Sequence, residues 1–229
     1  MRSSRWNAQG NVYLVTEESP LSPEAVRQAV GNADGILEVL RVVDDAVEIA
    51  IWNPDGSRAE LSGNGTRIAA RWLAEQTGAR SVTVRVDARD VRARMLDDTF
   101  VEQDVGAVQV GEPEEIDGIR FRPVVVGNPH AVVEGDPADL PRIGPQLETH
   151  PRFPERTNVQ VARWAGDEIE ARVWERGVGE TASSGTSAVA VAAALGAAET
   201  TIRFPGGPLH VRFVDGRALL TGPAVREGV

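Results

Sequence analysis

The sequence contains neither cysteine nor lysine among its 229 residues. Without cysteine, the chain can form no disulfide, no thiolate zinc site and no cysteine nucleophile. Without lysine, it can form no Schiff base, which excludes ordinary pyridoxal-phosphate chemistry, and it lacks the lysine of a nucleotide-binding P-loop. All 24 basic residues are therefore arginine. A protein with so few conventional catalytic groups remains, and we expect it to use neither a metal nor a cofactor.

Positive charge is also scarce relative to negative charge. The 34 acidic residues give a net charge of -10, which argues against general nucleic-acid binding. No apolar run approaches the roughly 18 residues that a membrane span requires, and the N-terminal segment lacks the apolar stretch of a secretory signal. We therefore expect a cytoplasmic protein that binds neither nucleic acid nor membrane.

Strand-like patterns outnumber helical ones along the chain. Twelve strand-like segments occur between Asn11 and Thr221, each alternating or rich in β-branched residues. Helical periodicity is confined to Ser22–Val30, Gly65–Gln76 and Thr186–Leu195. The last of these is nearly all alanine and valine, which predicts a helix buried on every side. Many strands with few helices predict the α+β class.

The two halves of the sequence follow one plan. In each half, a strand leads through a polar loop to a Ser-Gly pair that opens a helix, and the two serines, Ser62 and Ser184, are 122 residues apart. An acidic stretch at 112–117 lies between the halves. We therefore predict two pseudo-symmetric lobes, residues 1–113 and 114–229, with the last ten or so residues able to cross back to the first lobe.

The two Ser-Gly helix starts are the strongest candidate binding sites. A helix N-terminus presents free N–H groups and a partial positive charge, and glycine lets a ligand approach the backbone. Taken singly, Ser62 and Ser184 are equally consistent with ordinary helix caps. Because the same device occurs once in each half, the pair favours a cradle for a carboxylate or a phosphate.

Other polar residues lie at strand ends. Arg176 could hold a carboxylate through two hydrogen bonds and Glu175 could pair with an ammonium group, although a solvated ion pair is the common alternative. His130 could orient a reacting group or satisfy a loop carbonyl. Three asparagines could donate amides to a ligand or serve as turn residues; they are Asn11, Asn53 and Asn158.

Taken in order, these motifs resemble those of the diaminopimelate epimerases, which are cofactor-independent amino-acid epimerases. The resemblance runs almost from end to end of the chain. The motifs that carry it are Gly10-Asn11, Ala33-Asp34-Gly35-Ile36-Leu37, Asn53-Pro54-Asp55-Gly56-Ser57, Ser62-Gly63-Asn64-Gly65-Thr66-Arg67, Gly127-Asn128-Pro129-His130, Thr157-Asn158-Val159, Glu175-Arg176-Gly177-Val178-Gly179-Glu180-Thr181, Ser184-Gly185-Thr186, Pro205-Gly206-Gly207 and Thr221-Gly222-Pro223-Ala224.

The resemblance implies two lobes, each a mostly antiparallel sheet around a central helix, with the amino-acid substrate in a cleft between them. It also implies a homodimer and interconversion of LL- and meso-diaminopimelate by two acid/base groups that flank the α-carbon. The positions of those two groups are Ser62 and Ser184. His130 would lie near them as an orienting residue. By position, the expected substrate-binding residues are Asn11, Asn53, Gly63, Asn64, Asn158, Glu175, Arg176, Gly185 and Thr186.

This chain departs from the family pattern at both acid/base positions, where the family has cysteine and this sequence has serine. A hydroxyl is a much weaker acid than a thiol, whose pKa is about 8.5, so its conjugate base is scarce at neutral pH. Three interpretations follow. The chain is an epimerase that works with serines, a member of the fold that binds an amino acid or isomerises another substrate, or a variant whose serines were introduced by engineering.

Overall fold

The computed structural model describes residues 3–59 and 61–228, which form two compact units. Unit 1 comprises Met1–Asp104 and Thr221–Val229, and unit 2 comprises Val105–Leu220. The sequence-based boundary at 113/114 lies nine residues beyond this division. The difference arises because strand β8 (Phe100–Ala107) runs through residue 104 without a turn, and part of the acidic stretch forms a short strand, β10 (Glu114–Ile116).

Unit 1 is a mixed sheet with a long helix against it. Its strands are hydrogen-bonded in the order β19-β1-β2-β3-β4-β6-β7-β8, and β5 pairs with β4. The pairs β2–β3 and β4–β6 are parallel and the others are antiparallel. Besides β8, its elements are β1 (Ser3–Ala8), β2 (Asn11–Thr16), α1 (Pro23–Ala29), β3 (Gly35–Val43), β4 (Ala46–Trp52), β5 (Arg58–Ala59), α2 (Gly63–Thr77), β6 (Ser81–Val86), β7 (Arg89–Met95) and β19 (Val225–Arg226).

Unit 2 repeats this topology. Its strands pair in the order β9-β11-β12-β13-β14-β16-β17, with β12–β13 and β14–β16 parallel. Besides β10, its elements are β9 (Gln109–Val110), β11 (Ile119–Val125), β12 (Pro129–Glu134), a 3-10 turn η1 (Pro137–Asp139), α3 (Leu140–Glu148), β13 (Asn158–Ala165), β14 (Glu168–Glu175), β15 (Gly179–Thr181), α4 (Gly185–Ala194), β16 (Glu199–Phe204) and β17 (Gly207–Val214), and strand β18 (Arg217–Pro223) leaves the unit.

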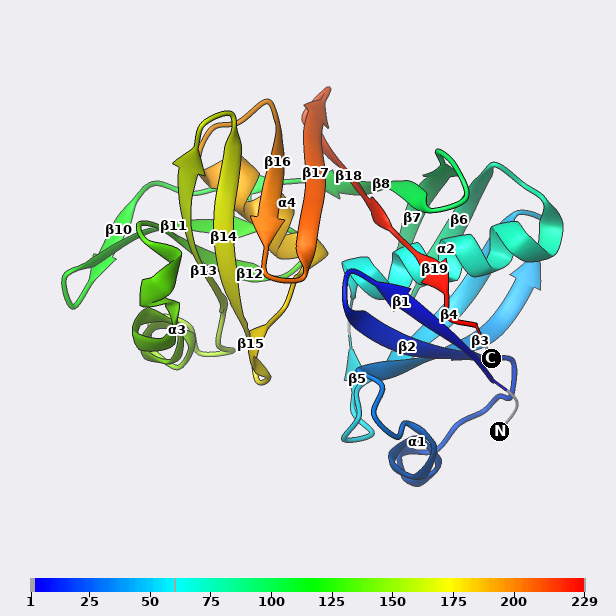
Figure 1. The fold of residues 1–229 in the computed structure, drawn as a ribbon. Coiled ribbons are helices and arrows are strands. Elements are labelled where there is room, and N and C mark those ends of the chain that lie inside the picture. Colours follow the sequence, from blue (N-terminus) through cyan, green and yellow to red (C-terminus); the bar gives the residue numbers. More distant parts are fainter. Residues whose placement is uncertain (1–2, 60, 229) are drawn as a thin grey trace. The chain divides into compact units, whose positions relative to one another are not determined.

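Each unit is therefore built from one strand-helix-strand crossover, a hairpin, a second crossover and another hairpin. The second crossover carries α2 in unit 1 and α4 in unit 2, and each of these helices packs on the strands of its own unit (Figure 1). The predicted α+β class with two pseudo-symmetric lobes is confirmed by this order of elements. The mostly antiparallel sheet predicted for each lobe also carries two parallel pairs, because each crossover joins parallel neighbours.

The two central helices differ in composition although both are largely buried. From Gly185 to Ala192, every residue of α4 is buried, and its alanines and valines pack against aliphatic side chains of the unit 2 strands. This confirms the prediction of a helix buried on all sides. Helix α2 is polar at several positions, and it ends at Gly78, which adopts the left-handed conformation (φ 75°) expected of a C-terminal glycine.

Several elements were missing from the sequence-based prediction. Helix α3 contains two adjacent residues, Gly144 and Pro145, that normally indicate a loop. The packing of its apolar side chains in the core of unit 2 outweighs their low helix propensity. Strands β1 and β12 were also absent from the prediction. The turn that precedes His130 covers residues 126–128, and His130 itself lies on β12 rather than in the turn.

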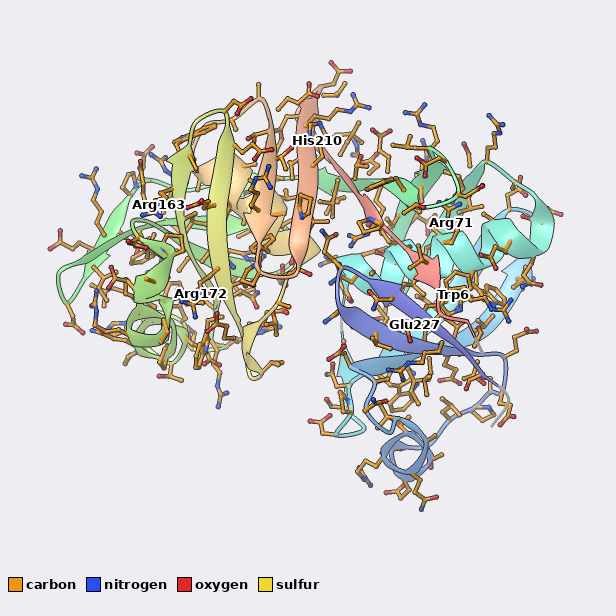
Figure 2. The ribbon with its side chains drawn as sticks, in the orientation of Figure 1. Trp6, Arg71, Arg163, Arg172, His210 and Glu227 are labelled. Atoms are coloured by element: carbon orange, nitrogen blue, oxygen red, sulfur yellow. The ribbon has the colours of Figure 1, made fainter. Side chains whose placement is uncertain are left out.

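The C-terminal segment completes unit 1. Ala224 is part of the unit 1 core, and β19 pairs with β1. Glu227 accepts hydrogen bonds from the side chains of Arg5 and Asn7, and Figure 2 shows it near Trp6 of β1. Within the part of the chain that the structure describes, no helix combines the length and the apolar character needed to cross a membrane.

Candidate active site

The first half of the candidate site lies at the N-terminus of α2. Ser62 caps this helix, and its Oγ accepts a hydrogen bond from the N–H of Gly65 at 3.0 Å. The same oxygen lies 3.2 Å from the hydroxyl of Tyr13, on β2. The Tyr13 ring fits there because Gly35 has no side chain, since a Cβ at that position would lie 2.7 Å from the ring. The Ser62 hydroxyl is therefore held both by its own helix and by β2.

A buried cation adjoins this helix terminus. Arg67 is fully buried and donates to the carbonyl oxygens of Gly63 and Pro223 and, at 2.6 Å, to Oδ1 of Asn64. No carboxylate among the described residues forms an ion pair with it. Burial lowers the pKa of Arg67 to about 9, so the guanidinium is still charged at neutral pH. Its charge adds to that of the helix N-terminus and favours an anion beside Gly63 and Asn64.

Two of the expected asparagines lie at the same edge of the unit 1 sheet. Asn11 opens β2 and Asn53 follows β4 directly. Because β2 and β3 are parallel while β3 and β4 are antiparallel, the start of β2 and the end of β4 meet at one edge. The Asn53 amide donates to Oγ of Ser57 at 2.9 Å, so it also stabilises the turn after β4.

The second half of the candidate site lies at the N-terminus of α4. Ser184 occupies the cap position in an extended conformation, yet its side chain makes no capping hydrogen bond. Ser184, Gly185 and Thr186 are all buried. The first N–H groups of a helix lack intrahelical partners, so this terminus is also suited to an anion. Ser184 thus resembles Ser62 in position but differs in how its hydroxyl is held.

Three of the predicted site residues form one row across the unit 2 sheet. His130 pairs with Asn158 in the parallel β12–β13 register, and Val159 pairs with Trp174 in the antiparallel β13–β14 register. Asn158 therefore lies beside Glu175, at the end of β14. The pairing brings together residues that are up to 45 positions apart in the sequence.

The imidazole of His130 is enclosed in a hydrogen-bond network. Its Nε2 lies 2.8 Å from Oδ1 of Asn128, and its Nδ1 lies 3.0 Å from Nε2 of Gln160, which also donates to Oγ of Ser187 on α4. Burial, with a smaller contribution from the nearby Arg176 charge, lowers the pKa of His130 to about 3, against the smaller opposing effect of the Gln160 hydrogen bond. The ring is neutral near pH 7 and both nitrogens have partners, which suits an orienting role rather than that of a base.

The turn after β14 carries the remaining predicted residues. Asn158 bridges two segments, because its Nδ2 donates to the Pro129 carbonyl and its Oδ1 accepts from the backbone N–H of Arg176, both at 3.0 Å. The guanidinium of Arg176 is half-buried and donates to the Glu155 carbonyl at 3.3 Å. Oε1 of Glu175 accepts a 2.6 Å hydrogen bond from the Thr181 hydroxyl.

The structure thus places the predicted residues in two groups, one in each unit. Sequence reasoning missed the contributions of Tyr13 and Gln160, and it noted Arg67 only as part of a motif. Tyr13 is the one tyrosine in the sequence and lies on a strand that was predicted, so its rarity was a usable signal. Gln160 had no such signal because it occupies a strand otherwise read as apolar. Within residues 3–59 and 61–228, no cluster of three acidic or histidine side chains could hold a metal ion.

Comparison with known proteins finds similarity over most of the chain. The family model described as diaminopimelate epimerase matches residues 20–113 and 123–227. The diaminopimelate epimerase of Brucella canis is 33% identical over an alignment that covers 98% of this chain and 88% of that protein.

Two solved structures are similar in fold at low sequence identity. A predicted epimerase from Pseudomonas aeruginosa has a TM-score of 0.75 at 17% identity, covering 99% of this chain and 97% of that one. A phenazine biosynthesis protein of the PhzF family from Bacillus anthracis has a TM-score of 0.76 at 14% identity, covering 99% and 96%.

Proposed function

The chain belongs to the diaminopimelate epimerase family, and from that premise we propose that it epimerises the α-carbon of diaminopimelate, interconverting the LL and meso forms without a cofactor. One observation carries the proposal. Each unit places a serine at the cap of its central helix, and further polar residues lie at strand ends of the same unit. Ser62 and Ser184 are the proposed acid/base residues.

The chemistry requires a proton to leave the α-carbon and another to return on the opposite face. One serine, as its conjugate base, accepts the proton and becomes a neutral hydroxyl, while the electron pair stays on the α-carbon and its carboxylate. The other serine then donates its proton to that carbon and becomes the conjugate base. The helix N-termini stabilise the negative charge on the carboxylate, with Gly63, Asn64, Gly185 and Thr186 as its proposed backbone contacts.

The remaining polar residues are proposed to bind different groups of the substrate. Arg176 is proposed to bind the distal carboxylate, because a guanidinium forms two parallel hydrogen bonds with such a group. Glu175 is proposed to pair with the α-ammonium group, and Asn11, Asn53 and Asn158 with the distal amino-acid end. His130 orients this part of the site through its network. We also propose that the protein acts as a cytoplasmic homodimer.

Serine is the weak point of this mechanism, because its hydroxyl is several pKa units less acidic than a thiol. The hydrogen bond from the Gly65 N–H and the charge of Arg67 favour a negative charge at Ser62, and the Tyr13 hydroxyl, 3.2 Å away, can donate a further hydrogen bond to the deprotonated serine. Among the residues that the structure describes, the Ser184 side chain makes no capping hydrogen bond of the kind that Ser62 makes. We therefore expect slow epimerisation by the unaltered chain.

Exchange of the substrate α-proton for deuterium tests the proposal. The unaltered protein should exchange the α-protons of LL- and meso-diaminopimelate slowly, and the double variant Ser62→Cys with Ser184→Cys should exchange them at least about 10³-fold faster. The matched control is Ser62→Ala with Ser184→Ala, which should show no exchange. Exchange that survives this alanine control, or no exchange with both cysteines in place, would contradict the assignment.

A second candidate function is isomerisation of a different substrate, or binding of an amino acid without turnover. It is favoured by the serines at both acid/base positions and by the fold shared with a phenazine biosynthesis protein. A thermal-shift screen over diaminopimelate stereoisomers and common D- and L-amino acids separates the candidates. Preferential stabilisation by diaminopimelate supports the first, whereas a response to other ligands alone supports the second.

A further inference from the structure

A buried carboxylate lies beneath the turn that carries Arg176. Glu148, the last residue of α3, is 6% exposed, and its two oxygens have different partners. Oε2 accepts a hydrogen bond from the indole N–H of Trp174, and Oε1 accepts one from the backbone N–H of Gly177, each at 2.7 Å. Glu148 thus joins the end of β14 to the turn that follows it.

The close approach of α3 to β14 depends on Gly144. A Cβ at Gly144 would lie 2.8–2.9 Å from Cβ and ring atoms of Trp174, so only glycine lets the helix lie this near. Glu148 is four residues further along α3 and therefore on the same helix face. This spacing brings its carboxylate within hydrogen-bond distance of the indole.

Three successive backbone N–H groups of the turn have fixed acceptors. The N–H of Arg176 donates to Asn158, that of Gly177 to Glu148, and that of Val178 to the carbonyl of Glu175. Gly177 adopts a positive φ of 75°, which a residue with a side chain rarely takes. The backbone on both sides of the Arg176 side chain is therefore held in one conformation.

Burial of this carboxylate carries a desolvation cost that the structure only partly offsets by opposite charge. Arg156 lies 3.5 Å from it, and because its side chain is 57% exposed this ion pair stabilises the carboxylate weakly. The two 2.7 Å hydrogen bonds from the Trp174 indole and the Gly177 N–H add to this compensation. A neutral side chain at this position would avoid the cost but could not accept from both donors.

We propose that Glu148 is a positioning residue, whose carboxylate holds the turn at residues 175–179 so that Arg176 can bind the substrate carboxyl group farthest from the reacting carbon. This rests on the proposed function, which assigns that group to Arg176. Glu148 acts through the turn and touches no substrate. It therefore determines selectivity for amino acids with a second carboxylate.

Unit 1 offers a matched control for this role. Glu38 is also buried and accepts a 2.7 Å hydrogen bond from the indole N–H of Trp52, which ends β4 as Trp174 nears the end of β14. The other oxygen of Glu38 accepts from Ser19 and from the N–H of Leu21, which lie before α1. Removing the Glu38 carboxylate thus breaks a comparable tryptophan contact without touching the turn at 175–179.

The test compares binding of LL-diaminopimelate with binding of L-lysine, which has the same chain length without the distal carboxylate. Glu148→Gln should lower affinity for LL-diaminopimelate by about tenfold and leave affinity for lysine unchanged, whereas Glu38→Gln should leave the ratio of the two affinities unchanged. In an Arg176→Gln background, Glu148→Gln should cause no further loss, because both changes remove the same interaction. Hydrogen exchange should show loss of protection at the Gly177 amide in Glu148→Gln and no such loss in Glu38→Gln.

The outcomes separate this proposal from the proposed function. Failure of the unaltered protein to bind LL-diaminopimelate overturns the proposed function and this proposal with it. If Arg176→Gln weakens binding but Glu148→Gln does not, the positioning role is wrong while the function stands. If Glu148→Gln does not fold, Glu148→Asp replaces it, since it keeps the charge but shortens the reach, and an unchanged affinity ratio in that variant would also overturn the role.

Discussion

The two units place different residues at the same point of the same topology. In unit 1, Tyr13 on β2 pairs with Gly35 on β3, and in unit 2, His130 on β12 pairs with Asn158 on β13. The tyrosine hydroxyl reaches the cap serine of its unit. The histidine instead connects through Gln160 to the first turn of α4.

This difference shows that a repeated fold need not give two equivalent half-sites. The Ser62 hydroxyl has two hydrogen-bond partners and lies near a buried cation, whereas the Ser184 hydroxyl makes no capping hydrogen bond and is near a neutral network. In the proposed reaction, one of these groups begins deprotonated and the other protonated, so unequal surroundings favour one direction of proton transfer. The backbone repeats in the two units, but the environment of the proton does not.

Single cysteine variants test this inequality most strongly. Ser62→Cys and Ser184→Cys should each accelerate α-proton exchange of mainly one diaminopimelate epimer, by about 10²–10⁴-fold, and the favoured epimer should differ between them. The gain should be larger for Ser62→Cys, because Tyr13, Gly65 and Arg67 stabilise a thiolate there. Deuterium incorporation followed by NMR measures both rates, and equal rates for both epimers in either variant would contradict the inequality.

The buried histidine predicts that unit 2 is the more acid-sensitive of the two units. Its pKa is about 3 when folded and about 6.5 when unfolded, so between these values the unfolded state binds more protons and stability falls as the pH falls. Between pH 7.5 and 4.5 this contribution should cost about 3 kcal/mol.

His130→Gln removes that contribution. Urea unfolding at pH 7.5 and 4.5 should show a smaller acid-induced loss of stability for this variant than for the unaltered protein. All other titratable groups are the same in the two proteins, so the difference reports on His130. Hydrogen exchange should place the difference in β12 and β13. An identical acid dependence in both proteins would show that His130 is protonated in the folded state near pH 4.5.

The smallest expected effect concerns the hydroxyl of Tyr13. Tyr13→Phe removes one hydrogen bond from Ser62 and should lower the free energy of unfolding by about 1 kcal/mol. The matched variant Thr181→Val removes the hydroxyl that donates to Glu175 in unit 2 and should cost a similar amount. In the background with both cysteines, Tyr13→Phe should slow exchange and Thr181→Val should leave the thiols unaffected. If Tyr13→Phe exchanges the α-proton as fast as the parent with both cysteines, Tyr13 has only a structural role.

Most of the fold followed from local sequence patterns. Alternation located the main strands, and the cap residues Ser62 and Gly78 bounded the longest helix closely because each makes a local hydrogen bond. Helix α3 was missed because Gly144 and Pro145 favour loops when considered alone. Their role becomes clear only beside Trp174, thirty residues away, which requires a glycine opposite it.

The candidate site was predictable in its residue types but not in its pairings. The motifs indicated His130, Asn158 and Glu175, yet only the strand register places them in one row. The role of Asn158 in holding the Arg176 backbone also depends on that register. Buried partners such as Glu148 leave no local sequence pattern, since their acceptors and donors come from distant segments.

The C-terminal segment has a consequence for the order of assembly during synthesis. The Pro223 carbonyl that accepts from Arg67, the Ala224 side chain in the unit 1 core and strand β19 beside β1 are all translated after the whole of unit 2. During synthesis, the whole of unit 2 is therefore translated as one continuous segment before the last strand of unit 1 has been made. The buried guanidinium of Arg67 can acquire its full set of acceptors only after Pro223 has been translated, so unit 1 cannot be completed before unit 2 has been synthesised.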